Sequence, residues 1–270
     1  MISVISVINN EKIAKEFLLR GLSNQNTRFE LILLDNKASF YKSASQAYNR
    51  ASIKAKGDYL VFIHQDVLLP SKNWLKETES WLSTLPKFGL AGVAGMLKPK
   101  FLNELEICVY YYLLRRLGMT SFWFHRFGRG NIFHGPGKLP WKGKFISNTV
   151  SVQTLDELLL IVPSNVFDRI KFDENVCDGW NLYGVDYSLA VSRKGLEVYV
   201  LPCPVFHLSI GKINRLYFKT LTKLIEKHKI EKVINTTCGP WPTNQKLAQL
   251  LLSKSLFHQP QEMKNREHLA

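Results

Sequence analysis

The sequence predicts an α/β fold, Rossmann-like, with a mostly parallel sheet flanked by helices. Three short apolar segments rich in β-forming residues, 2–8, 29–34 and 59–63, alternate with two segments of helical periodicity, 11–22 and 43–55. This alternation is typical of parallel strands joined by crossover helices. Polar residues directly follow each apolar segment, and the carboxyl ends of parallel strands share one edge of a sheet, where ligands bind.

Local sequence justifies each of these elements. The helix expected over 11–22 has Phe17 and Leu18 on its apolar face. Ser43 is a plausible N-cap for the next helix, and Gly57 follows that helix as a stop. The segment YLVFI that comes next is apolar throughout, as expected for a strand buried on both faces.

The second half of the chain has weaker periodicity. We expect a helix over 71–85, a strand over 89–96, a further strand over 151–163 and a basic amphipathic helix over 214–234. Residues 98–150, rich in aromatic, Gly, Pro and basic residues, are interpreted as an insertion or a mobile lid over the site. We therefore predict one α/β domain followed by a helical C-terminal appendage.

Composition and charge restrict the class of protein. Lys and Arg exceed Asp and Glu by 36 − 22 = 14, which favours nucleic acid, phosphorylated ligands or an acidic membrane surface as partners. No run of eighteen apolar residues and no signal peptide is found, so no spanning helix is expected. The four cysteines are far apart, which fits a reduced, cytoplasmic protein. The two commonest glycine-rich nucleotide fingerprints are absent.

The polar residues at the strand ends are Asn9, Asp35 with Asn36, and the run His64, Gln65 and Asp66. A carboxylate beside a buried strand is expensive without a partner. Asp66 therefore either lies at a solvated strand end or holds a positively charged ligand.

A longer stretch gives these residues a context. Residues 47–66, AYNRASIKAKGDYLVFIHQD, are similar to the motif AxNxGxxxAxGEYIxFLDxD of the family 2 nucleotide-sugar glycosyltransferases, which have the GT-A fold. Further along, Phe172-Asp173-Glu174, Asp186 and His207 follow in the order typical of that family. The resemblance covers roughly residues 1–215, apart from the insertion, and leaves 216–270 as a helical extension and tail.

The resemblance implies transfer of a sugar, a hexose in many members, from a nucleotide-diphosphate-sugar donor to an acceptor hydroxyl with inversion. It also implies a divalent cation, Mn²⁺ or Mg²⁺, that neutralises the departing diphosphate. The residues it assigns are Asp66 and His207 as metal ligands, Asp35 as a nucleotide contact and Asp186 as the catalytic base. By position and chemistry, we add Asn9, Asn36, His64 and Gln65 for the nucleotide, Lys212 and Arg215 for the diphosphate, and Asp156, Glu157 and Trp180 for the acceptor or sugar.

Each of these assignments has a structural alternative. Asp35 and Asp66 are also typical of turns after strands, and Asp186 is a good helix N-cap. His207 could be a buried histidine of the core, and Trp180 a core side chain. Asp156 and Glu157, a charged pair inside an apolar segment, could lie at a solvated strand edge.

The chain departs from the family motifs at two positions. His64 occupies the place of the first Asp of a D-x-D motif, and Val185 that of the first carboxylate of a Glu-Asp pair. These departures leave open a catalytically inert relative that binds a sugar nucleotide or glycan. A basic nucleic-acid or membrane-surface binder and a nucleotidyltransferase also remain open.

The expected partners are a nucleotide-sugar donor and a glycan or lipid-linked acceptor. The basic, aromatic region 110–145 could be a lid, an acceptor groove or a membrane contact. No nucleic-acid recognition module is found, so a nucleic-acid partner is not expected. We expect a cytoplasmic protein, either free or peripheral at the inner face of the membrane.

Overall fold

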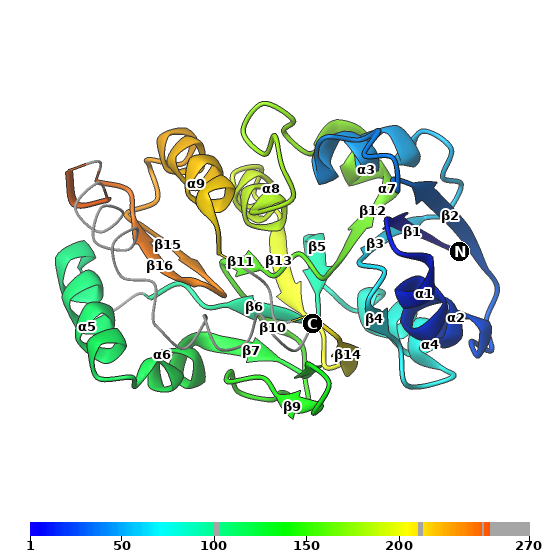
Figure 1. The fold of residues 1–270 in the computed structure, drawn as a ribbon, viewed down its shortest axis with the longest axis horizontal. Helices are drawn as coiled ribbons and strands as arrows, with labels where there is room; N and C mark the ends of the chain where they lie inside the picture. Colours follow the sequence, from blue (N-terminus) through cyan, green and yellow to red (C-terminus); the bar gives the residue numbers. More distant parts are fainter. Residues whose placement is uncertain (100–102, 210–212, 245, 249–270) are drawn as a thin grey trace.

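A computed structural model describes residues 1–99, 103–209, 213–244 and 246–248. Its central seven-stranded sheet has the order β10-β13-β5-β12-β3-β1-β2 (Figure 1). Five strands run in one direction, and β12 and β10 run against them, so the sheet is mostly parallel, as predicted. The strands are β1 (Ile2–Ile8), β2 (Phe29–Asp35), β3 (Tyr59–Ile63), β5 (Phe88–Gly92), β10 (Val150–Ser151), β12 (Leu159–Pro163) and β13 (Glu197–Val200).

Helices cover both faces of this sheet because its strands alternate their side chains between two apolar cores. On β3, Val61 and Ile63 join one core, and Leu60 and Phe62 join the other. The helices around the sheet are α1 (Glu11–Ala14), the π-helical turn η1 (Lys15–Leu19), α2 (Arg20–Ser23), α3 (Ala44–Ser52), α4 (Trp74–Leu82), α7 (Ser164–Arg169) and α8 (Tyr183–Ser192).

The predicted N-terminal elements are confirmed. The helix expected over 11–22 is continuous from α1 to α2, and both flanking strands start where predicted. Ser43 is the N-cap of α3, since its hydroxyl accepts a hydrogen bond from the Gln46 amide at 3.1 Å. Gly57 is required before β3, because a Cβ at this position would lie 2.5 Å from the Ser3 amide nitrogen.

Two predicted strands are wrong in extent. The segment 89–96 divides into β5 and β6 (Ala94–Met96), which belong to different sheets. The segment 151–163 divides into β10, β11 (Thr154–Leu155) and β12. Asp156 and Glu157 lie in the connection between the last two strands, which explains how a charged pair interrupts an apolar run.

Region 98–150, as far as it is described, forms two helices and short strands that belong to the smaller sheets. It contains α5 (Glu104–Arg116), α6 (Thr120–Phe127), β7 (Gly128–Gly130), β8 (Ile132–His134) and β9 (Leu139–Pro140). A three-stranded sheet has the order β11-β6-β7, and a four-stranded sheet has the order β4-β14-β8-β9, with β4 at Val67–Leu68 and β14 at Val205–His207.

The C-terminal part also differs from prediction. Helix α9 (Arg215–Lys227) ends well before residue 234, and β15 (Val233–Thr236) and β16 (Gly239–Pro242) follow as a hairpin. The β-branched residues of VINTT favour a strand at this point. Leu221 and Leu224 of α9 pack in one apolar cluster with Leu189 of α8, so this segment is joined to the α/β core. No helix within the described residues is long and apolar enough to cross a bilayer.

Candidate active site

Three strands end in an apolar pair followed by histidine: Phe62-Ile63-His64, Ile132-Phe133-His134 and Val205-Phe206-His207. His134 and His207 are register partners on the parallel strands β8 and β14, with ring centroids 5.4 Å apart. The ring of His64 lies 5.8 Å from that of His207. The topology therefore gathers three imidazoles at one place.

Asp66 completes this cluster. The candidate ligand atoms of His64, Asp66 and His207 all lie within 4.8 Å of one another. Asp66 Oδ1 is 3.3 Å from His207 Nε2, and its Oδ2 accepts a hydrogen bond from the Ser209 amide at 3.2 Å. The side chain of Asp66 is 14% exposed and that of His207 8%, so the cluster is largely shielded from solvent.

The charge states follow from burial and mutual contact. Burial alone would raise the pKa of Asp66, but the hydrogen bond and charge of His207 outweigh it and hold this pKa well below its usual range. Burial, and then the neighbouring His207, lower the pKa of His64 and likewise of His134. The carboxylate of Asp66 is thus ionised, and the imidazoles of His64 and His134 are neutral near pH 7. A carboxylate binds a metal in its ionised form, and an imidazole binds it in its neutral form.

Tyr183, the first residue of α8, orients His64. Its hydroxyl donates to the Glu157 carbonyl at 3.0 Å and lies 2.9 Å from His64 Nε2. Because the tyrosine proton is used on the carbonyl, His64 Nε2 is the donor of the second bond. The Nδ1 atom of His64 then keeps its lone pair for a ligand.

The residues of the cluster fit a divalent cation on two counts. Two imidazole nitrogens and one carboxylate oxygen form a mixed donor set that suits a first-row transition ion such as Mn²⁺ better than Mg²⁺, which prefers oxygen ligands alone. In addition, the Nδ1 atom of His207 is buried and has no hydrogen-bond partner among the described residues.

The predicted nucleotide contacts lie at the ends of β1, β2 and β3, and one of them, Asn36, is buried. Gln65 joins the ends of β3 and β1, because its Oε1 accepts from the amides of Asn9 and Asn10 at 3.0 Å each, and its amide also bonds the Asn9 side chain. Asp35 is exposed at the end of β2 and pairs with Lys37 at 3.2 Å. Asn36, in contrast, is buried, and its amide closes a turn by bonding both backbone groups of Tyr41.

Asp156 and Glu157 lie beside this edge. Asp156 Oδ2 accepts from the Thr237 hydroxyl at 2.7 Å. The Oε1 atom of Glu157 is buried without a hydrogen-bond partner among the described residues. A Cβ at Gly184 would lie 3.1 Å from Glu157 Cγ, so the absence of a side chain there leaves room for the glutamate. Burial, and then the charge of Asp156, raise the pKa of Glu157 to about 8.

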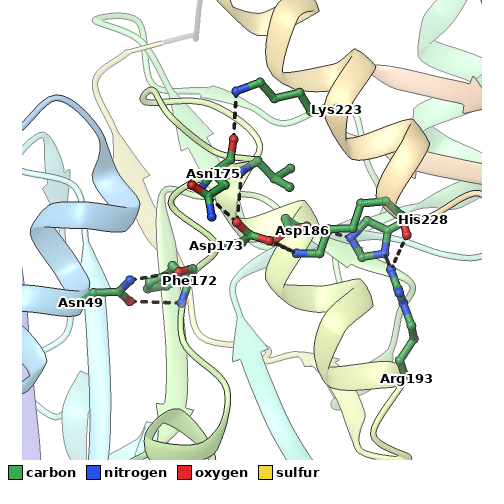
Figure 2. Close-up of polar contacts among 10 residues, drawn as sticks. Asn49, Phe172, Asp173, Asn175, Asp186, Arg193, Lys223 and His228 are labelled. Atoms are coloured by element: carbon green, nitrogen blue, oxygen red, sulfur yellow. Dashed lines mark hydrogen bonds and ion pairs between the residues drawn. The ribbon is translucent and has the colours of Figure 1, made fainter.

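Asp186 is held in a separate network between α8 and α9 (Figure 2). Its side chain is 3% exposed, and its oxygens accept from Lys227 Nζ at 2.8 Å and His228 Nε2 at 2.7 Å. Lys227 also pairs with Asp173 at 2.9 Å, and Arg193 bonds the other ring nitrogen of His228. Both carboxylate oxygens of the predicted base are therefore occupied, one by Lys227 at the end of α9 and one by His228, the C-cap of that helix.

The remaining predicted contacts lie at the surface or outside the described residues. Trp180 is 43% exposed in the turn before α8, which suits stacking against a sugar ring. Arg215 is exposed at the first position of α9. Lys212 lies outside the described residues.

Sequence reasoning missed His134 and Tyr183. The signal for His134 was present, since its triplet repeats the apolar-apolar-His pattern of the other two strand ends. Nothing local distinguishes Tyr183, because its role depends on which side chain faces it across the fold.

The fold is that of GT-A glycosyltransferases. The model of a glycosyltransferase-like family matches residues 3–104, which include Asp35 and Asp66 but end before Asp186 and His207. No curated protein sequence matches the chain.

Three solved structures illustrate the shared fold. A mannosyltransferase from Pyrobaculum calidifontis, in complex with GDP-Man and Mn²⁺, has 14% identity and a TM-score of 0.50 over 85% of this chain and 64% of its own. S. aureus TarS 1–349 has 14% identity and a TM-score of 0.54 over 87% and 66%. GalNAc-T7 with UDP, GalNAc and Mn²⁺ has 12% identity and a TM-score of 0.55 over 84% and 48%. The chain thus spans less than two thirds of the length of each.

Proposed function

We propose that this protein is a metal-dependent glycosyltransferase that moves a sugar, most simply a hexose, from a nucleotide-diphosphate-sugar to an acceptor hydroxyl. The observation that carries the proposal is the cluster of His64, Asp66 and His207 at the carboxyl ends of the strands, on a GT-A fold. Two of the similar structures contain Mn²⁺, which supports the use of a divalent cation by this protein.

The geometry supports an assignment of residues to the donor. Asp66, His207 and His64 Nδ1 would hold the cation, and Tyr183 fixes the tautomer of His64. A bound divalent cation supplies charge neutralisation for the departing diphosphate. Gln65 and Asn9, tied to each other, and the exposed Asp35 form the nucleotide side, and the cations of Lys212 and Arg215 are assigned to the diphosphate. The buried Asn36 shapes the loop that carries these contacts.

The acceptor proton has two candidate destinations. As the acceptor oxygen forms its bond to the sugar anomeric carbon, the bond to the diphosphate oxygen breaks and a carboxylate takes the hydroxyl proton. Asp186 is the prediction from the family resemblance, but both its oxygens are engaged by α9. The Oε1 atom of Glu157 is buried without a hydrogen-bond partner among the described residues, and a pKa raised to about 8 makes its carboxylate a stronger proton acceptor than that of an ordinary glutamate.

We assign the role of general base to Glu157, and to Asp186 the structural role of anchoring α9 to α8. Glu157→Gln should abolish the chemical step while donor binding persists, and Asp186→Asn should lower stability more than turnover in the surviving folded protein. Loss of turnover in folded Asp186→Asn, with an active Glu157→Gln, would restore Asp186 as the base. Asp156 and the exposed Trp180 are assigned to the acceptor or sugar, and inversion is expected for this single displacement.

The domain assignment follows the same proposal. Residues 1–215 are assigned as the catalytic unit, with 98–150 as its insertion, and 216–270 as the C-terminal extension, of which α9 packs on α8. The acceptor is a glycan or a lipid-linked sugar.

The first experiment is thermal stability with a panel of nucleoside diphosphates, with and without Mn²⁺, on wild type and Asp66→Ala. A ligand at 100 times its Kd stabilises by about 2.7 kcal/mol. We expect a Mn²⁺-dependent shift for one nucleotide, lost in Asp66→Ala and kept in Asp178→Ala, whose carboxylate pairs with two lysines of α9. No shift for any nucleotide would contradict the proposal. A shift without sugar transfer would identify an inert binding relative, and release of pyrophosphate a nucleotidyltransferase.

A further inference from the structure

Helices α5 and α6 expose an unusual number of apolar side chains. Eight of the twenty large apolar residues exposed within the described part of the chain fall between residues 105 and 122. They are Leu105, Val109, Tyr110, Tyr112, Leu113, Leu117, Met119 and Phe122. Clustered apolar exposure of this kind marks an interaction surface rather than ordinary scatter.

The pattern along α5 shows that this exposure is built into the helix. Leu105, Val109 and Leu113 recur at intervals of four residues and are 60%, 49% and 50% exposed. Ile107 and Leu114, on the other side, are buried in an apolar cluster with Trp123 of α6. The helix is thus apolar on two faces, and only one of them is used by the fold.

The turn from α5 to α6 extends the same surface. Leu117 and Phe122 are 68% and 57% exposed on either side of Gly118, whose φ of +70° closes the turn. Figure 1 places both helices at the end of the molecule opposite the N-terminal strands β1 and β2, where their outer side is free of other described elements. Leu105, Val109, Tyr110 and Leu113 line one surface hollow together with Arg126 of α6. We name the exposed apolar surface of the two helices the α5–α6 face and define it by the eight residues given above.

The charge around the α5–α6 face is mostly positive. Residues 107–155 contain seven Lys and Arg residues and no Asp or Glu. Arg115, Arg116 and Arg126 are exposed beside the apolar side chains. The acids of α5, Glu104 and Glu106, lie in its first turn, where they bond the Asn244 amide and the Asn103 amide of the capping box.

We propose that the α5–α6 face docks on an anionic lipid bilayer, with its apolar side chains in the interfacial region and its arginines against lipid phosphates. Amphipathic surfaces that combine Leu, Phe and Tyr with a basic rim bind membranes in this way. A nucleic acid would match the charge but leave the apolar side chains in water. A protein partner would need acids facing three arginines.

The docking surface is separate from the proposed sugar transfer, so its test does not depend on activity. Co-sedimentation of the purified protein is measured with vesicles of phosphatidylcholine alone and of phosphatidylcholine with phosphatidylglycerol, at low and high NaCl. We expect binding to the mixed vesicles only, partly retained at high salt because apolar insertion is not screened.

A pair of double variants isolates the surface. Leu113→Glu with Arg116→Glu places two acids on the face, and Ile53→Glu with Lys54→Glu makes the same charge change at exposed residues of the α3 C-terminus. All four side chains are exposed, and thermal melts check that both variants remain folded. The first variant should lose at least about tenfold in partition coefficient, and the second less than about threefold.

Equal losses in the two variants would overturn the proposal, as would absence of binding to anionic vesicles. Binding that is displaced completely by polyuridylate would favour a nucleic-acid surface instead. A concentration-dependent dimer of the wild type, dissociated by Leu113→Glu with Arg116→Glu, would assign the face to a second copy and likewise overturn it.

Discussion

Two clusters of aspartate and histidine in this protein use the same chemical groups in opposite ways. In the first, Asp66 meets His207 at 3.3 Å, and the Nδ1 atom of His207 is without a partner among the described residues. In the second, Asp186 meets His228 at 2.7 Å, and every polar atom of both side chains is engaged. A saturated cluster joins elements of the fold, whereas an unsaturated one retains the capacity to bind.

The burial of the two clusters agrees with this difference. His228 is fully buried and Asp186 is 3% exposed, while Asp66 is 14% exposed at the edge of the sheet. Substitutions in the first cluster should therefore affect ligand binding, and those in the second should affect stability.

The largest effect is expected for Asp66→Ala. Loss of the single carboxylate of the first cluster should lower turnover by about a thousandfold, since metal stabilisation of the leaving group is worth several kcal/mol. Steady-state kinetics over a range of Mn²⁺ concentrations measures the change. The melting temperature without ligand should fall less than in Asp186→Ala, since the lowered pKa of Asp66 reflects mainly its contacts with His207 and Ser209, and an equal fall would mean that Asp66 is a structural residue like Asp186.

The next effect is expected for Asp186→Ala. The change leaves the buried His228 and the half-buried Lys227 without their carboxylate partner, so the free energy of unfolding should fall by about 3 kcal/mol. Asp173 still pairs with Lys227 after the change, so the loss is expected at the lower end of the range for breaking a buried ion pair.

Urea unfolding measures this loss, with Asp178→Ala as the matched control. Asp178 also pairs with lysines of α9, but it is 37% exposed, so its removal should change stability by less than about 1 kcal/mol. Equal effects of the two variants would show that burial does not distinguish these ion pairs.

A smaller effect is expected for Tyr183→Phe. Removal of the hydroxyl frees His64 Nε2, so the tautomer that offers Nδ1 to a ligand is no longer selected. Mn²⁺ affinity should fall about tenfold, as is typical for the partner of a metal-binding histidine. Isothermal titration calorimetry with Mn²⁺ alone measures it, and unchanged affinity would argue against His64 as a ligand.

The smallest effect is the pH dependence of stability that His228 confers. Burial lowers the pKa of His228 in the folded protein despite the opposing contact with Asp186. Below the unfolded pKa of about 6.5, the unfolded chain binds a proton that the folded protein does not, so stability is lost as pH falls through and below this value.

The slope from one such histidine is at most about 1.4 kcal/mol per pH unit. Arg193 and Lys227 also face His228 and disfavour its protonation. The pKa values of His64 and His134 are lowered as well, so these residues add to the same trend. Urea unfolding between pH 7 and 5 should therefore be less steep for His228→Gln than for wild type, without becoming flat. Identical slopes would show that His228 does not contribute to the pH dependence of stability.

The sequence by itself determined the N-terminal elements and the positions of Asp66 and His207 at strand ends. Hydrophobic periodicity is a local property, so β1, the helix after it, α3 and β3 follow from neighbours a few residues apart. The polar run His64, Gln65 and Asp66 was noticeable because it breaks an apolar strand.

Only the tertiary structure decided how distant polar residues are grouped. Strand pairing sets His134 opposite His207, and the packing of α9 on α8 occupies Asp186, whereas the gap at Gly184 leaves room for Glu157. The division of segment 151–163 into separate strands and the exposure of the α5–α6 face could not be predicted from the sequence for the same reason. Burial and hydrogen-bond saturation depend on residues far apart in the chain, and local sequence patterns carry no record of which of them will meet.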